Sequence, residues 1–119
     1  MSETLLLAVP TKGERAMKET VSNIFAKAPT FTFVEVVKGE VSGVTVEENK
    51  AADLLQGTGP IVIKNLKDKG VDIVIANELG PGAKTLIDIS GIKMVQIETG
   101  ITVKEAVTEA LRQILQATL

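Results

Sequence analysis

The stretch Val71-Asp72-Ile73-Val74-Ile75-Ala76, followed by Asn77-Glu78-Leu79-Gly80-Pro81-Gly82, decides the fold that the sequence predicts. Its first half is apolar and β-branched at nearly every position, which is typical of a strand buried on both faces of a parallel sheet. Pro81 suits the first position of a helix, where a missing N–H group is no loss. A strand, a glycine-bearing turn and a helix start in this order direct backbone N–H groups toward one place, where an anion or an anionic cofactor can bind.

A near-repeat with an offset of 21 residues extends this pattern in both directions. Each copy has a Gly-Pro pair, a later glycine and an apolar run: Gly59-Pro60, Gly70 and 71–76, then Gly80-Pro81, Gly91 and 92–97. Proline at the first helical position and glycine just past the last one are the expected marks of helix ends. The repeat therefore predicts two consecutive helix–strand units, joined by right-handed crossovers in a parallel sheet.

The N-terminal half predicts three further strands. Residues 5–9 form an apolar run, and residues 31–37 and 40–46 alternate around a Lys38-Gly39 turn, which predicts a hairpin with an exposed edge. Residues 14–30 fit no regular element because Pro29 stops a helix, and residues 51–55 predict a short helical turn.

The last helix has a clear start. Thr102 and Glu105 have the spacing of a capping box. An apolar stripe at helical spacing follows, and we expect it to pack on the sheet rather than bind a partner. The stripe comprises Val103, Ala106, Val107, Ala110, Leu111, Ile114 and Leu115.

Composition limits the kinds of partner. The 119 residues fit one domain, the net charge is −2, and the three aromatic residues are all Phe. Neither a basic footprint nor a Tyr or Trp stacking platform is present, so we expect no nucleic-acid partner. The N-terminus has no basic region and its apolar run is too short for a signal core or a membrane span. We therefore expect a cytoplasmic protein with no membrane partner.

The sequence contains neither Cys nor His. Disulfides, thiolate or imidazole metal centres, Cys-His nucleophiles and Ser-His-Asp triads are thereby excluded. We assign no catalytic residue and no metal-ligating residue.

Four stretches, taken in order, carry a resemblance to a known family. They are Ala8-Val9-Pro10-Thr11; Val21-Ser22-Asn23-Ile24-Phe25-Ala26-Lys27-Ala28-Pro29-Thr30-Phe31; Gly57-Thr58-Gly59 with residues 69–76; and Leu79-Gly80-Pro81-Gly82-Ala83 with residues 91–93 and 100–106. The second is similar to a Val-Ser-x-x-Phe-Gly-Arg-Ala-Pro-x-Phe segment. Together they cover nearly the whole chain and resemble the dinitrogenase iron–molybdenum cofactor biosynthesis family, small carriers and homologous domains associated with nitrogenase cofactor assembly.

This resemblance implies a three-layer α/β/α sandwich with a ribonuclease H-like motif. Its five-stranded mixed sheet has the order 3-2-1-4-5, with strand 2 antiparallel, over a single domain of residues 1–119. The ends of strands 1 and 4 then form a topological switch point, where open α/β sheets commonly bind ligands. The candidate cofactor-binding residues come from segments expected near that point: Thr11, Lys12, Phe25, Lys27, Gly57, Gly59, Asn77, Gly80 and Gly82.

Structural roles compete with binding at several of these positions. The glycines of the 80–82 turn also suit a tight connection, and Lys12 and Lys27 also suit solvated positions. Asn77 can cap the turn instead of touching a ligand. Glu78 would stabilise a helix start and at the same time repel an anion there.

The chain departs from the family pattern within its second stretch. Ile24 stands where many members have His, and Ala26-Lys27 replaces Gly-Arg, which removes a bidentate anion clamp. The resemblance implies an iron–molybdenum or iron–sulfur cluster precursor as cofactor, but no Cys or His can ligate it. Its identity is therefore left open. What remains for binding is backbone N–H groups with Lys12 or Lys27.

Two classes of function compete at this point. The first is a non-catalytic binding or carrier protein that takes a metal cluster or an anionic small molecule, with an altered or lost ligand. The second is a small enzyme acting on an anionic metabolite or nucleotide at the switch point. No acid–base pair is evident, since Asp72 and Glu98 lie at opposite ends of their strands. A homodimer built on the exposed edge strand is a third interpretation.

Overall fold

The computed structural model describes residues 4–54 and 56–117. The elements within this range follow one another along the chain as β1 Thr4–Thr11, η1 Ala16–Lys18, β2 Thr30–Val37, β3 Glu40–Glu48, η2 Lys50–Asp53, α1 Thr58–Lys69, β4 Ile73–Ala76, α2 Pro81–Ser90, β5 Lys93–Gln96 and α3 Val103–Ala117. The elements η1 and η2 are short 3-10 helices. Residue 55, the last of the predicted turn at 51–55, lies outside the described residues.

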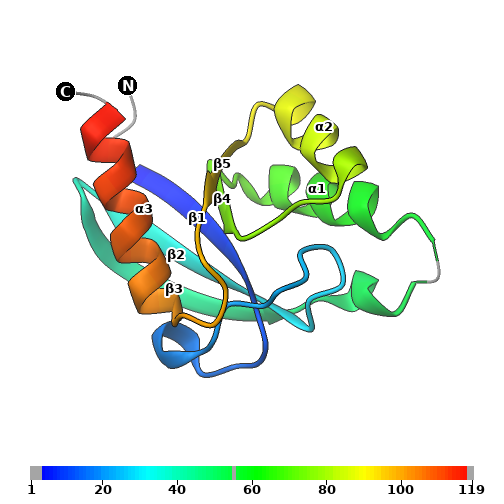
Figure 1. Ribbon diagram of the computed structural model, residues 1–119, viewed down its shortest axis with the longest axis horizontal. Helices are drawn as coiled ribbons and strands as arrows, with labels where there is room; N and C mark the ends of the chain where they lie inside the picture. Colours follow the sequence, from blue (N-terminus) through cyan, green and yellow to red (C-terminus); the bar gives the residue numbers. More distant parts are fainter. Residues whose placement is uncertain (1–3, 55, 118–119) are drawn as a thin grey trace.

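The five strands form one mixed sheet in the order β3-β2-β1-β4-β5. Strand β2 runs antiparallel to β1 and to β3, whereas β4 runs parallel to β1 and to β5. Helices α1 and α2 cover one face and α3 covers the other, so the chain is a three-layer α/β/α sandwich (Figure 1). The predicted fold class, strand order and antiparallel strand 2 are confirmed.

Successive side chains of the central strands point to opposite faces of the sheet, so a core forms on each face. In β1, Leu7 and Val9 pack with α3, while Ala8 faces the side of α1 and α2. The apolar stripe of α3 lies in the core, as predicted: its side chains at positions 103, 106, 107 and 110 are buried against the sheet. The side chain of Leu115 lies outside the described residues.

The predicted helix ends agree with the structure at three of four positions. Gly70 and Gly91 both end a helix in the left-handed conformation, and Pro81 is the first residue of α2. Helix α1, however, begins at Thr58, so Pro60 is its third residue rather than its first. The reason lies in Gly57, whose φ of 74° turns the chain into the helix earlier than the proline does.

The capping box of α3 is formed as predicted. The backbone N–H of Thr102 donates to Glu105 Oε1 at 3.0 Å, and the N–H of Glu105 donates to Thr102 Oγ1 at 3.2 Å. The hydrogen bond from the Thr102 backbone, with a second from its hydroxyl, lowers the pKa of Glu105. Two N–H groups that a helix start would leave open are thereby satisfied.

Thr102→Ala is expected to lower the free energy of unfolding by about 1 kcal/mol, because the cap is lost. Urea unfolding measures this change. Thr108→Ala is the matched control, since that hydroxyl only bonds back to the Lys104 carbonyl within α3. In the control, the free energy of unfolding should be unchanged or slightly higher than in the wild type. Equal losses in the two variants would contradict a capping role.

Strand β3 forms an edge of the sheet and is mostly exposed, as the sequence predicts. A register shift at Glu35/Val36 leaves Ser42 as an extra residue of β3, where a bulge interrupts the ladder. None of the helices in the described ranges is long and apolar enough to cross a membrane.

Candidate functional site

A groove of about 450 Å³ lies where the chain that follows β4 approaches the start of α1. Three segments line it: the loop between η1 and β2, the first turn of α1, and the turn into α2. The lining residues are Asn23, Ile24, Phe25, Ala26, Lys27, Thr58, Gly59, Glu78, Gly80 and Ala83. Four predicted binding residues, Phe25, Lys27, Gly59 and Gly80, thus come together here; their binding role remains a prediction.

The glycines that line the groove are not required by the fold. A Cβ atom added to Gly59 or Gly80 would meet nothing within 4 Å beyond the residues adjacent to it in the chain. Gly80 has φ −61° and ψ 160°, a conformation open to any residue and favoured before a proline. Gly57 differs, because its positive φ is one that side chains rarely adopt. A bare backbone at Gly59 and Gly80 leaves room for a ligand to approach the main chain closely.

Two helix starts border the groove, and neither has a side-chain cap among the described residues. Helix α1 begins after Gly57 and α2 begins after Gly80, and neither of these N-cap glycines has a side chain that could cap the first turn. The first N–H groups of a helix have no partner within it, and its dipole places partial positive charge there. Helix α3, away from the groove, is closed by its capping box. The two uncapped starts are the ones suited to receive an anion.

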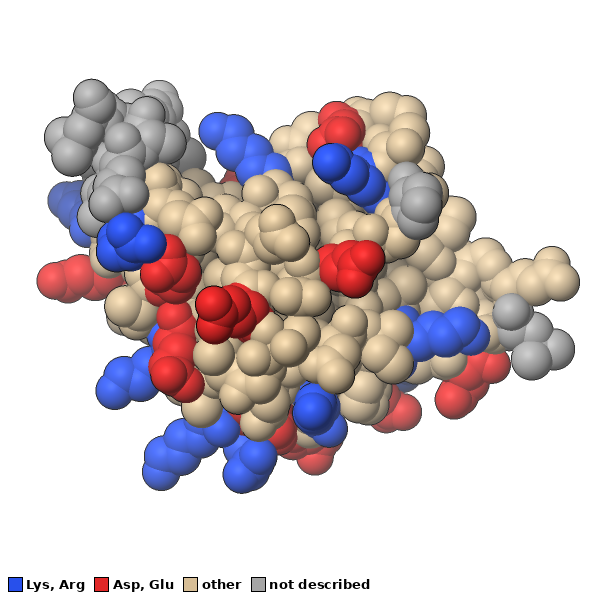
Figure 2. Space-filling model, in the orientation of Figure 1, with Lys and Arg blue, Asp and Glu red and all other residues tan. Residues whose placement is uncertain are grey.

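The charged groups that line the groove have opposite signs. The ammonium of Lys27 donates to the Leu54 carbonyl at 2.7 Å, which uses one of its three donors. Glu78 is exposed and its carboxylate opposes an anion. Figure 2 shows both signs of charge on one face, with Lys and Arg mostly around its margin and Asp and Glu both at the margin and within the face. An anion in the groove would therefore depend on backbone N–H groups more than on net charge.

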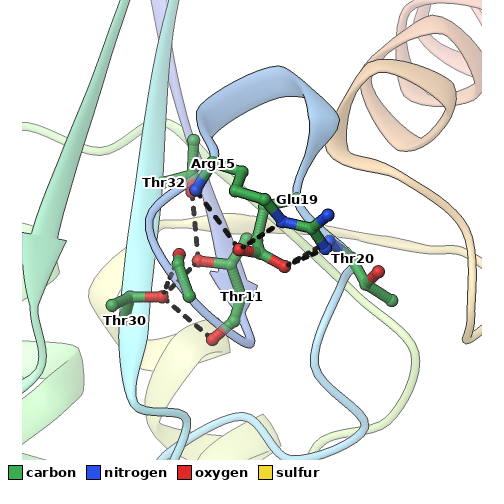
Figure 3. Close-up of polar contacts among 7 residues, drawn as sticks. Thr11, Arg15, Glu19, Thr20, Thr30 and Thr32 are labelled. Carbon is green, nitrogen blue, oxygen red and sulfur yellow. Dashed lines mark hydrogen bonds and ion pairs between the residues drawn. The ribbon is translucent and has the colours of Figure 1, made fainter.

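Thr11 lies inside the sheet, away from the groove. It is fully buried, and its Oγ1 is 2.7 Å from Thr30 Oγ1 and 3.0 Å from Thr32 Oγ1 (Figure 3). The Thr30 hydroxyl also reaches the carbonyls of Thr11 and Gly13. The Thr11 hydroxyl of β1 thus bonds to both threonine hydroxyls of β2, so its visible role is structural.

The chain after Thr11 turns toward α3, which takes Lys12 away from the groove. The N–H of Lys12 donates to the Thr20 carbonyl, and the N–H of Val103 at the start of α3 donates to the Glu19 carbonyl. Asn77 lies elsewhere again: its amide donates to Ile97 O at 2.9 Å and lines a separate hollow beside α3. Gly57 and Gly82 lie next to groove-lining residues without lining the groove themselves.

Glu19 organises the loop that the sequence leaves unassigned. Its buried carboxylate accepts hydrogen bonds from the backbone N–H groups of Arg15 and Thr20 and from the Arg15 guanidinium (Figure 3). The Arg15 side chain, followed by the Thr20 N–H, holds the pKa of Glu19 at about 2, below the usual 4.5. A Cβ atom at Gly13 would lie 2.6 Å from Glu19 Oε1, so a side chain there would displace the carboxylate from its present position.

Asn49 lies near the groove and was not among the residues predicted to form the site. It lies directly after β3, in a charged stretch that suggests a solvated turn. Its side-chain amide instead reaches the groove wall and donates to the carbonyls of Ala26 and Ala28, each at 2.8 Å. The available signal was an Asn directly before the short helix η2, where its Oδ1 accepts from the Ala51 N–H.

The donors at the groove decide which ligands fit. With no Cys or His in the sequence, ligation of a metal by thiolate or imidazole does not fit. Backbone N–H groups at two helix starts, with the ammonium of Lys27 nearby, fit an anion whose outer atoms accept hydrogen bonds. A cluster precursor fits only if it meets this description.

The fold and the groove define a class: a small α/β/α sandwich with a groove beside the chain that leaves a central strand. The chain belongs to the dinitrogenase iron-molybdenum cofactor family, whose model matches residues 4–113. No curated protein sequence matches the chain at a significant level.

Solved structures agree with this assignment. TM1290 from Thermotoga, described as a DUF35 family member, is 34% identical, with a TM-score of 0.73 over 91% of this chain and 88% of that chain. The apo form of the orange protein from Desulfovibrio gigas has a TM-score of 0.82 at 24% identity, over 95% of this chain and 92% of that one. MJ0327 from Methanococcus jannaschii has a TM-score of 0.70 at 16% identity, over 96% and 92%. The last two show the fold alone.

Proposed function

We propose that this protein is a non-catalytic carrier that holds an anionic small molecule or metal-cluster precursor in the groove. The observation that carries the proposal is the pair of uncapped helix starts that border the groove, where Gly59 and Gly80 leave the main chain bare. Membership of a cofactor-associated family supports the same conclusion. The N–H groups at the two starts would bind the anion, and the apolar wall with Ile24 and Phe25 would exclude water from it.

A cluster precursor would bring redox-active metal already coordinated by its own atoms, because the chain supplies no soft ligand. The role of the protein is then to bind, shield and release it. An enzymatic role would need an acid–base pair, and the titratable groups lining the groove, Lys27 and Glu78, are a cation held by a carbonyl and an exposed carboxylate.

Anaerobic reconstitution with ferrous iron, sulfide and molybdate, followed by gel filtration, tests the proposal. We expect iron or molybdenum to elute with the protein and to give absorption above 300 nm. The chain has no Tyr or Trp, so such absorption comes from the bound group. If no metal is retained, the cluster-precursor part of the proposal is wrong. Protection against heat by a phosphate-bearing metabolite would then leave an anionic small molecule as the cargo, and the absence of both effects would overturn the carrier proposal. Turnover of a nucleotide that is lost in Glu78→Gln would favour the enzyme instead.

A further inference from the structure

The wall of the groove formed by residues 23–28 is a loop and depends on contacts with other segments. Phe25 anchors it from below, with its ring buried and packed edge-on against Phe31 at a centroid distance of 5.6 Å. Two turn-like hydrogen bonds, Ile24 N to Ser22 Oγ and Ala28 N to Phe25 O, shape the loop locally. These contacts leave the carbonyls of Ala26 and Ala28 in need of donors.

One side chain supplies both donors. Asn49 Nδ2 donates one hydrogen to Ala26 O and the other to Ala28 O, each at 2.8 Å, so the donating capacity of its amide is fully used. Asn49 is fixed in turn, because its Oδ1 accepts from the Ala51 N–H and its own N–H donates to Pro29 O. The amide therefore lies in one orientation between the loop and the end of β3.

The same segment leads to the opposite side of the groove. Residues 49–54 connect β3 toward α1, whose first turn lines the groove through Thr58 and Gly59. The ammonium of Lys27 adds a second tie by donating to the Leu54 carbonyl. Asn49 and Lys27 thus join the loop wall to the chain that enters α1, and movement of this chain would change the width of the groove.

We infer that Asn49 is a positioning residue that holds the loop wall in register with the chain that enters α1. It does not line the groove, so it acts through the backbone of Ala26 and Ala28 rather than by touching a ligand. This inference rests on the proposed function. An aspartate at this position would keep the shape but place carboxylate oxygens against two carbonyls, so both hydrogen bonds would be lost.

Asn49→Asp and Asn49→Ala test the inference, with inorganic molybdate as the anion and hydrogen exchange of residues 22–29 as the structural readout. At a temperature where each variant is folded, we expect about tenfold faster exchange of the loop and about tenfold weaker molybdate binding, the scale of one or two lost hydrogen bonds. Asn49→Ala removes the two donors without adding a charge, so it separates the effect of the lost hydrogen bonds from that of the new carboxylate. Asn65→Asp, at an exposed position of α1 outside the groove, is the matched control and should change neither quantity.

The outcomes separate the two proposals. Molybdate binding by the wild type that persists unchanged in both Asn49 variants overturns the positioning role and leaves the carrier proposal standing. A wild type that binds no molybdate counts against both, and faster exchange in the variants then assigns Asn49 a purely structural role. Loss of binding in Asn65→Asp as well would attribute the effect to net charge and overturn the inference.

Discussion

Gly59→Leu is expected to abolish anion binding in a protein that stays folded, whereas Gly82→Leu is expected to leave binding intact. The two glycines are a matched pair, because Gly59 is the second residue of α1 and Gly82 is the second residue of α2. Each faces open space, and neither has a positive φ. They differ in that Gly59 lines the groove and Gly82 does not. A leucine side chain at Gly59 would occupy the space that the ligand needs.

Stability and binding should separate at Gly59. Replacing glycine within a helix removes a cost of about 0.5–1 kcal/mol, so Gly82→Leu should be as stable as the wild type or slightly more stable. At Gly59 the Cβ atom would crowd the ring of Pro60 and offset this gain, so Gly59→Leu should stay folded with little gain in stability. Molybdate binding by isothermal titration and urea unfolding measure the two effects. Undiminished binding in Gly59→Leu would move the anion site away from this groove, and equal loss in both variants would point to a general effect on helix starts.

Acid is expected to destabilise this protein mainly through Glu19. The carboxyl has a pKa of about 2 when folded and an ordinary value of 4.5, so its stabilising effect is complete above pH 4.5 and is lost as the pH falls toward 2. We expect a loss of about 2 kcal/mol across this interval. This is less than the full change in pKa implies, because the Arg15 side chain is 69% exposed and its charge is screened.

Glu19→Gln isolates this contribution. Urea unfolding at pH 6 and pH 2.5 should show a smaller acid loss in the variant than in the wild type, since the variant has no group at this position to protonate. Glu105→Gln serves as a control, because Glu105 also has a lowered pKa but is exposed at the start of α3. If Glu19→Gln loses as much stability in acid as the wild type, the Arg15–Glu19 contact is not the acid-sensitive element.

Most of the architecture follows from local patterns in the sequence. Glycine marked the ends of α1 and α2 and proline marked the start of α2, since these residues act on the backbone beside them. The 21-residue offset identified the two parallel units. Local patterns of this kind did not predict the shape of the loop at residues 14–30. Its shape depends on Glu19 and on a hydrogen bond from Val21 N to Ile101 O, between segments far apart in the sequence.

In the candidate site, too, some residues could be predicted from the sequence and others depend on contacts between distant segments. The Phe25, Gly59 and Gly80 segments were selected by family resemblance and do lie around one groove. Thr11 was selected because its segment was expected near the switch point at the ends of strands 1 and 4, but its hydroxyl bonds across to β2. Asn49 was missed because its partners are backbone carbonyls more than 20 residues away, and no composition rule indicates which carbonyls lack a donor.

The three phenylalanines form a continuous row under one side of the molecule. Phe25 lines the groove and contacts Phe31; Phe31 is 6.4 Å from Phe33, over which the ammonium of Lys69 lies at 4.8 Å. They are also all the aromatic residues of the chain. The aromatic region of a proton NMR spectrum therefore contains three ring systems ordered by their distance from the groove. A ligand that binds in the groove should therefore shift the ring signals of Phe25 most and those of Phe33 least. The Phe33 signals then serve as an internal reference, and no added label is needed.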